Sequence, residues 1–450
     1  MLEMDGRFLK TCAGVTRRSM LKAGAVAMAG LSLPDLLRRQ HAAASSLSGT
    51  GVGSEKSLIL IWLDGGPPHH ETYDPKPDAP TEFRGPLGSI ETTIPGVRLS
   101  ELLPRHAAIL DKVSLIRTMH HKNGDHFAAA HWMLTGFLGS NAVNLPAVNP
   151  SAPSVIAKLK GARTEGLPAY VGLPRTHSVG IAPGYHGAAY LGVAHNPFTA
   201  NIDPNQPSYQ VPNLNLPDGV TIDRMSERRA LLNAFDHVRR ESDAVGMLDG
   251  LDEFTRRAFE MVTGPRARAA FDINREDPKL RDRYGRHQWG QCALVARRLV
   301  EAGVRCVTLT YGGWDWHSTI KEGMERQLPI IDAAIASLIS DLDARGLLET
   351  TMVVVMGEFG RTPRINATAG RDHWGDAMSV LIGGGGVRPG VVVGSTNVKG
   401  EVPRDRPVTP ADLIVTIYHH MGIDPATTFH NHAGRPIPIG NDGRVIDELC

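Results

Sequence analysis

Five short, mostly apolar runs constrain the fold of this chain more than any other feature. They lie at residues 57–63 (SLILIWL), 113–117, 304–310, 352–356 and 378–382. A strand buried on both faces reads as a continuous apolar run, which is typical of a parallel sheet covered by helices. Residues 288–302, 327–344 and 410–421 carry apolar positions at helical spacing, with Thr409 as a helix N-cap before Pro410. This alternation predicts an α/β fold with a mostly parallel central sheet covered on both faces.

The composition is that of an ordinary globular protein and excludes several other classes. Hydrophobic residues make up 42% of the 450 residues and charged residues 21%. Lysine and arginine total 48 against 47 acidic residues, so the chain lacks the basic excess of a nucleic-acid-binding protein, and four cysteines exclude a disulfide scaffold. We expect one domain over residues 45–450, with a loop-rich insertion around residues 142–220, where Pro, Asn and Gly are frequent.

The N-terminal segment has the pattern of an export signal. Residues 16–22 read TRRSMLK, an Ala/Gly-rich apolar run follows at residues 23–33, and Ala42, Ala43 and Ala44 form a small-residue exit. This order favours a twin-arginine signal over an ordinary amphipathic helix, and the apolar run is too short for a stable membrane anchor. The pattern predicts recognition by the twin-arginine translocase, removal of residues 1–44, and a periplasmic or otherwise exported protein.

Polar side chains gather directly after four of the predicted strands. Asp64 ends the first run, a histidine-rich stretch at residues 120–131 follows the second, Asp315 and His317 follow the third, and Glu358 follows the fourth. In a parallel sheet, ligands bind outside the carboxyl ends of strands. Any one of these residues alone fits a solvated loop, but carboxylates and imidazoles together suit a divalent metal such as Zn or Mn. Two such ions about 3.5–4 Å apart can hold both oxygens of an ester displacement.

Several strings resemble those of a known exported family. They are LIWLDGGPPHHETYDPKP at residues 60–77, DHFAAAHWMLTG at 125–136, GGWDWH at 312–317, GEFGRTP at 357–363 and GRDHW at 370–374. Together they resemble the family called domain of unknown function 1501, which is itself similar to the alkaline phosphatase and sulfatase superfamily. The resemblance implies an α/β/α sandwich that binds one or two divalent metals and hydrolyses phosphate or sulfate esters.

The resemblance also implies a set of metal ligands, with two departures from the superfamily pattern. One residue separates Asp315 from His317, where the superfamily ligands are separated by three. Phe359 follows Glu358, where the superfamily has an Asp-His pair. The implied ligands of one or two Zn, Mn or Ca ions are Asp64, Asp315, His317, Glu358, Asp372 and His373.

The catalytic group departs furthest from the superfamily. Sulfatases place a Cys or Ser nine positions before the Thr of a Leu-Thr-Gly ending, and here that position is His126, counted from Thr135. His126 could form a phospho-histidine, bind metal, act as a base, or mark the loss of activity. Arg361 could contact an anionic ester through both guanidinium nitrogens, or pair with Glu358.

Two functions therefore follow from the sequence. One is a metal-dependent hydrolase acting on a small anionic ester or a sulfated glycan. The other is a catalytically silent, metal-stabilised binding protein on the same fold.

Overall fold

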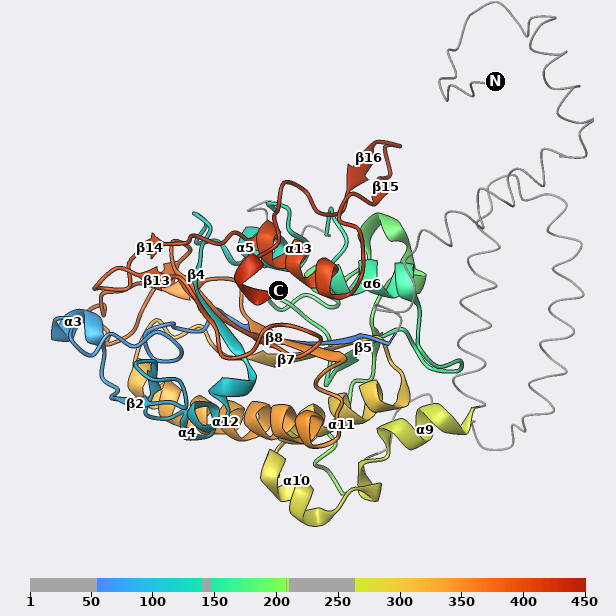
Figure 1. Cartoon of the computed structure of the whole chain (residues 1–450), viewed down its shortest axis with the longest axis horizontal. Coiled ribbons are helices and arrows are strands. Elements are labelled where there is room, and N and C mark those ends of the chain that lie inside the picture. Colours follow the sequence, from blue (N-terminus) through green and yellow to red (C-terminus); the bar gives the residue numbers. More distant parts are fainter. Residues whose placement is uncertain (1–54, 140–146, 208, 210–263) are drawn as a thin grey trace, which may run out of the picture. The chain divides into compact units, whose positions relative to one another are not determined.

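An eight-stranded sheet forms the centre of the computed structural model, which describes residues 55–139, 147–207, 209 and 264–450 (Figure 1). The predicted signal peptide at residues 1–44 lies outside the described residues. The strand order across the sheet is β12-β4-β11-β8-β1-β7-β5-β6. The strands are β1 (Ser57–Asp64), β4 (Ser114–Met119), β5 (Tyr170–Leu173), β6 (Phe198–Thr199), β7 (Cys306–Gly312), β8 (Thr351–Met356), β11 (Met378–Gly383) and β12 (Val392–Val393).

The described residues also form four two-stranded antiparallel pairs and a set of helices. The pairs are β2 (Ser89–Glu91) with β3 (Arg98–Ser100), β9 (Gly360–Arg361) with β10 (His373–Trp374), β13 (Ser395–Thr396) with β14 (Pro403–Asp405), and β15 (Thr428–His430) with β16 (Pro436–Pro438). The described helices are α3 (Thr81–Arg84), α4 (Pro104–Ala108), α5 (His126–Thr135), α6 (Ala152–Lys160), α9 (Pro265–Phe271), α10 (Pro278–Tyr284), α11 (Gln288–Ala302), α12 (Ile320–Ala344) and α13 (Pro410–His420). None of these helices combines the length and apolar character that crossing a membrane requires.

The predicted α/β fold with a mostly parallel sheet is confirmed, with one strand reversed. Strand β11 pairs antiparallel with both of its neighbours, β4 and β8, and all other pairs in the sheet are parallel. A parallel return needs a long crossover, usually helical, but residues 357–377 between β8 and β11 contain no helix. The chain therefore turns back directly. As a result, the residues before β11 arrive at the edge where β1, β4, β7 and β8 end.

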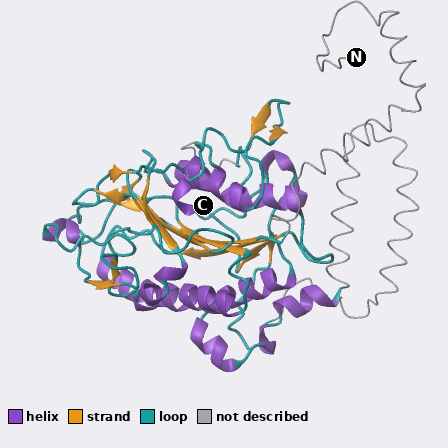
Figure 2. Cartoon of the chain, in the orientation of Figure 1, coloured by secondary structure: helices purple, strands orange, loops and turns teal. Residues whose placement is uncertain are grey.

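Helices cover both faces of the sheet, which gives an α/β/α sandwich (Figure 2). Helices α4, α11 and α12 lie on one face, and α5, α6 and α13 lie on the other (Figure 1). Alternate residues of β1 enter the two cores: Ile59 and Ile61 pack toward α11 and α12, whereas Leu60 and Trp62 pack toward α13. Because both faces are buried, the strand is apolar at every position from Leu58 to Leu63, which explains the run in the sequence.

The helix predictions hold with small differences at the ends. Helix α11 has the predicted bounds, whereas α12 begins at Ile320, seven residues before the predicted start. Helix α13 begins with the predicted cap: the Thr409 side chain accepts from Asp412 N, and the Asp412 carboxylate accepts from Thr409 N. This reciprocal arrangement is a capping box, which satisfies amides that a helix start leaves unpaired.

The segment predicted as a loop-rich insertion also builds one edge of the sheet. Within it, α6 packs on one face, and β5 and β6 extend the parallel sheet beyond β7. These strands have four and two residues and are flanked by Pro and Gly, so they show no apolar periodicity. Residues 140–146, 208 and 210–263 lie outside the described part of the chain.

Candidate metal centre

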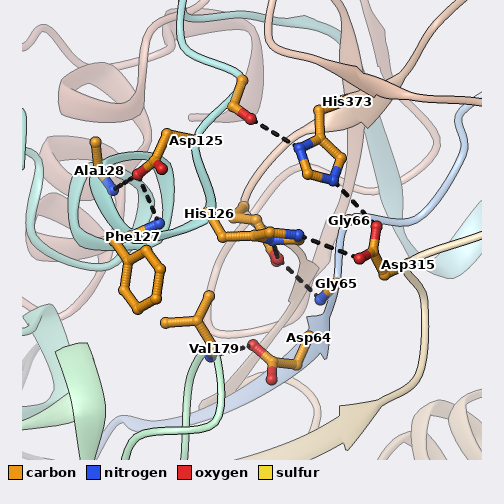
Figure 3. A network of polar contacts seen from close by, with 12 residues as sticks. Asp64, Gly65, Gly66, Asp125, His126, Phe127, Ala128, Val179, Asp315 and His373 are labelled. Atoms are coloured by element: carbon orange, nitrogen blue, oxygen red, sulfur yellow. Dashed lines mark hydrogen bonds and ion pairs between the residues drawn. The ribbon is translucent and has the colours of Figure 1, made fainter. Parts of the chain in front are cut away.

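Side chains from several strand ends converge at the carboxyl edge of the sheet (Figure 3). His126 opens α5 shortly after β4, Asp315 follows β7, and His373 lies on β10 just before β11. His373 Nε2 is 3.1 Å from Asp315 Oδ1, and His126 Nε2 is 3.5 Å from Asp315 Oδ2. One ligand atom from each of the three residues lies within 4.8 Å of the others. The structure thus brings together residues that lie up to 247 positions apart in the sequence.

His317 and His373 both direct their Nε2 atom at Asp315. His373 Nδ1 donates to Gly124 O (2.8 Å), and His317 Nδ1 donates to Asp372 Oδ1 (2.7 Å). Carbonyl and carboxylate oxygens only accept, so Nδ1 is the donor in both rings, and Nε2 is the nitrogen that can bind a cation. These Nε2 atoms lie 3.0 Å apart, and His317 Nε2 is 2.9 Å from Asp315 Oδ1. Three acceptors that face one another need a cation or a proton between them.

Glu358 lies beneath this cluster and is completely buried. Its Oε1 accepts from Gly65 N (2.9 Å) and from His126 Nδ1 (2.7 Å), whereas its Oε2 has no hydrogen-bond partner. Burial raises the pKa of Glu358, and the nearby Asp64 carboxylate raises it further. A buried carboxylate oxygen without a partner is costly, and a bound cation would relieve that cost.

Asp64 joins the site at the end of β1. Its Oδ1 accepts from Trp62 Nε1 (2.8 Å) and Val179 N (2.9 Å), so the orientation of the carboxylate is fixed. Its Oδ2 lies 3.7 Å from His177 Nε2. No sequence pattern pointed to His177, because the strand before its loop, β5, is too short to predict.

The first turn of α5 orients His126. The side chain of the N-cap, Asp125, accepts from the backbone of Phe127 and Ala128 (both 3.0 Å) and so fixes the helix start (Figure 3). Burial lowers the pKa of His126, but hydrogen bonds to Asp315 and Glu358 outweigh it and raise the value to about 9. Near neutral pH, His126 is therefore protonated on both ring nitrogens and positively charged in the cation-free protein.

Contacts with neighbouring residues lower the pKa of two other carboxylates of the cluster, Asp315 and Asp372. Burial raises the pKa of Asp315, but hydrogen bonds from His126, His373 and Arg361 outweigh it and lower the value well below the usual range. The hydrogen bond from His317 lowers the pKa of Asp372. Anionic carboxylates of this kind are the form that binds a cation.

Arg361 pairs with a different carboxylate from the one expected. Its guanidinium is fully buried and donates to Asp315 Oδ1 (2.6 Å), Gly66 O (2.9 Å), Arg371 O (3.2 Å) and Gly65 O. It pairs with Asp315 rather than with Glu358, and four of its five N–H groups donate to acceptors within the protein. The reason is the glycine turn after β1, whose carbonyls come close enough to surround the guanidinium.

Phe359 also belongs to the site. In the sequence it was notable only because it stands where the superfamily has a histidine. Its ring is buried, stacks on His373 with centroids 4.5 Å apart, and lies 4.8 Å from the His126 ring. An aromatic ring at this position holds two imidazoles by contact and supplies no ligand atom.

A family model described as "Protein of unknown function (DUF1501)" matches residues 55–450, which confirms the resemblance found in the motifs. Solved structures with a similar arrangement include a lipoteichoic acid synthase from Listeria monocytogenes, at 11% identity over 87% of this chain and 76% of that chain, with a TM-score of 0.36. A sulfatase from Pseudoalteromonas sp. matches at 12% identity over 82% and 68%, with a TM-score of 0.34. A phosphonate monoester hydrolase of Agrobacterium radiobacter matches at 11% identity over 88% and 77%, with a TM-score of 0.35. No curated protein sequence matches the chain significantly.

Proposed function

The chain belongs to the family described as "Protein of unknown function (DUF1501)", and we propose that it is a divalent-metal-dependent hydrolase of sulfate or phosphate esters. The single observation that carries this proposal is the triangle of Asp315 Oδ1, His317 Nε2 and His373 Nε2, with all three separations between 2.9 and 3.1 Å. Outer hydrogen bonds from Nδ1 to a carboxylate or a carbonyl are typical of metal-binding histidines, because they fix the ring and its tautomer.

The charge of the site supports a cation as well. Of the lysines and arginines in the described part of the chain, only Arg361 forms an ion pair with a carboxylate of the metal centre. An anionic ester approaching without a metal would meet strong repulsion, since like charges within a few ångströms interact unfavourably. This repulsion would come from the four carboxyl groups of the metal centre, those of Asp64, Asp315, Glu358 and Asp372.

Each residue has a distinct role in this proposal. Asp315, His317 and His373 hold a Zn, Mn or Ca ion, and Asp64 and Glu358 supply further oxygens. When bound, the ion would polarise the ester and neutralise charge that develops on its oxygens. His126, between two carboxylates, accepts or returns a proton at Nε2. The substrate would be a small anionic ester or a sulfated glycan.

The alternative function is a metal-stabilised binding protein without catalysis. One observation favours it: the position to which the sulfatase resemblance assigns a Cys or Ser nucleophile carries His126, whose Nδ1 donates to Glu358.

Metal analysis of the purified, exported protein, paired with a screen of aryl sulfates and aryl phosphates, tests both functions. For the hydrolase we expect at least one bound divalent ion per chain. At least one ester should be cleaved, with loss of activity on chelation and recovery when metal returns. A bound ion without any ester cleavage would support the binding protein. A protein that binds no divalent ion would contradict the proposal.

We also propose export through the twin-arginine route, on the strength of residues 16–33. Replacing Arg17 and Arg18 together with lysine should leave the uncleaved precursor in the cytoplasm, because the translocase reads the arginine pair. Fractionation and mass spectrometry of the N-terminus measure this. Arg38 and Arg39 offer a matched control: they follow the apolar run, so their replacement by lysine should not change export. Normal export of the Arg17/Arg18 variant would rule out the route.

A further inference from the structure

A buried ion pair lies behind the metal centre and joins two motifs that are 300 positions apart. The Arg371 guanidinium donates from Nε to both oxygens of Glu71 (3.0 and 2.9 Å) and from Nη2 to Oε1 (2.7 Å). Both side chains are at most 1% exposed. The remaining donors of Arg371 go to the backbone carbonyls of Thr362 (2.9 Å), Phe83 (2.9 Å) and Pro363.

The backbone around the pair leaves room for it. Gly85 has φ +82°, and a Cβ there would collide with Glu71 Oε1 and lie 2.7 Å from Arg371 Nη2. Only glycine fits such a position without strain. The end of α3, the segment after β1 and the loop after β9 therefore all meet at this one guanidinium.

The backbone of Arg371 contacts both halves of the metal centre. Its N–H donates to Trp316 O (3.0 Å), and Trp316 stands between Asp315 and His317. Its carbonyl accepts from Arg361 Nη1 (3.2 Å), and Arg361 Nη2 in turn donates to Asp315 Oδ1 (2.6 Å). Asp372 and His373 come immediately after Arg371 in the chain. The position of this one residue thus sets the separation between the Asp315–His317 turn and His373.

We propose that Glu71 and Arg371 are positioning residues whose ion pair sets the geometry, and hence the cation affinity, of the Asp315–His317–His373 site. Neither side chain reaches the reacting atoms, because both are engaged behind the loop that carries His373. The inference rests on the proposed cation site. Outer-shell partners that orient ligands typically contribute about 10- to 100-fold in metal affinity, which is the effect we expect here.

The experiment measures Mn²⁺ and Zn²⁺ affinity of the mature chain by chelator competition, at a temperature where circular dichroism shows each variant folded. The variants are Arg371→Lys and Glu71→Gln. The first keeps the charge but loses the planar guanidinium that donates from two nitrogens, and the second keeps the shape but loses the charge. Each should weaken cation binding about 10- to 100-fold and change the visible absorption of the Co²⁺-loaded protein.

A second buried ion pair in the same chain provides the control. Arg297 on α11 is fully buried and pairs with Glu276 (2.8 Å) and Asp341 (2.9 Å), and none of the three belongs to the metal centre. Arg297→Lys and Glu276→Gln should lower the melting temperature and leave cation affinity within about twofold of wild type, since a structural ion pair affects folding alone.

A double variant, Glu71→Leu with Arg371→Met, separates positioning from stability. Replacing a buried pair by apolar residues of similar volume is often neutral for stability, so this protein should fold and still bind the cation weakly. Wild-type affinity in the folded single or double variants would overturn the inference while leaving the proposed function intact. A wild-type protein that binds no cation would overturn both.

Discussion

Replacing Asp315 with asparagine should abolish cation binding, because the change removes the one carboxylate that both Nε2 atoms face. Asparagine keeps the shape but brings an amide where a charge is required. If the chain is a hydrolase, turnover should fall about 100- to 10,000-fold, since a bound metal contributes several kcal/mol to the transition state. Metal titration and kinetics on the same preparation measure the two effects.

Asp372→Asn is the matched control for this prediction. Asp372 contacts the metal centre through His317 Nδ1, and its loss should cost about 10- to 100-fold in affinity rather than all of it. Equal effects of the two changes would mean that Asp372 is itself a direct ligand. Wild-type affinity in Asp315→Asn would show that the cation binds elsewhere.

Replacing His126 with alanine should lower the rate of ester hydrolysis about 100- to 10,000-fold, the usual contribution of a positioned acid–base group. The fold should survive, because α5 keeps its N-cap at Asp125. Replacement of the exposed His430 on β15 by alanine is the control and should leave the rate unchanged. Full activity in His126→Ala would remove His126 from the mechanism.

The same variant should change how cation affinity depends on pH. Below its pKa of about 9, His126 is a positively charged imidazolium in the cation-free protein, and this charge repels a cation that binds beside it. Cation affinity should therefore fall as the pH decreases below about 9, because protonation of His126 and cation binding oppose each other. In His126→Ala this part of the dependence should disappear, and titrations across pH 6 to about 10 would detect it. An unchanged pH dependence of cation affinity in His126→Ala would mean that His126 does not interact with the bound cation.

The core of the fold was predictable because burial on both faces leaves a local signature. The continuous apolar residues of β1 and β8, and the helical spacing in α11, each reflect one physical environment over a whole element. The direction of β11 was not predictable in this way. Its apolar run reads the same whichever way the strand points, and only the helix-free connection after β8 decides it.

The sequence indicated several residues of the site but not the contacts that these residues make. Asp64, Asp315 and Glu358 were found because they directly follow buried strands whose ends share one edge. His177 was missed because it follows a four-residue strand, β5, that has no periodic signal. Arg361 was predicted as a site residue, but its pairing with Asp315 was not, because its side-chain direction depends on carbonyls contributed by the turn after β1.

By itself, the sequence determined the α/β fold and the chemical nature of the donors, because burial and residue type are properties of each position. Only the tertiary structure decided which atoms of those donors face one another. The Nε2 atom of His373 points at Asp315 because Gly124 O accepts from its Nδ1, and the Nε2 atom of His317 does so because Asp372 accepts from its Nδ1. These partners lie 249 and 55 positions away along the chain, so no local pattern could have shown which nitrogens meet beside Asp315.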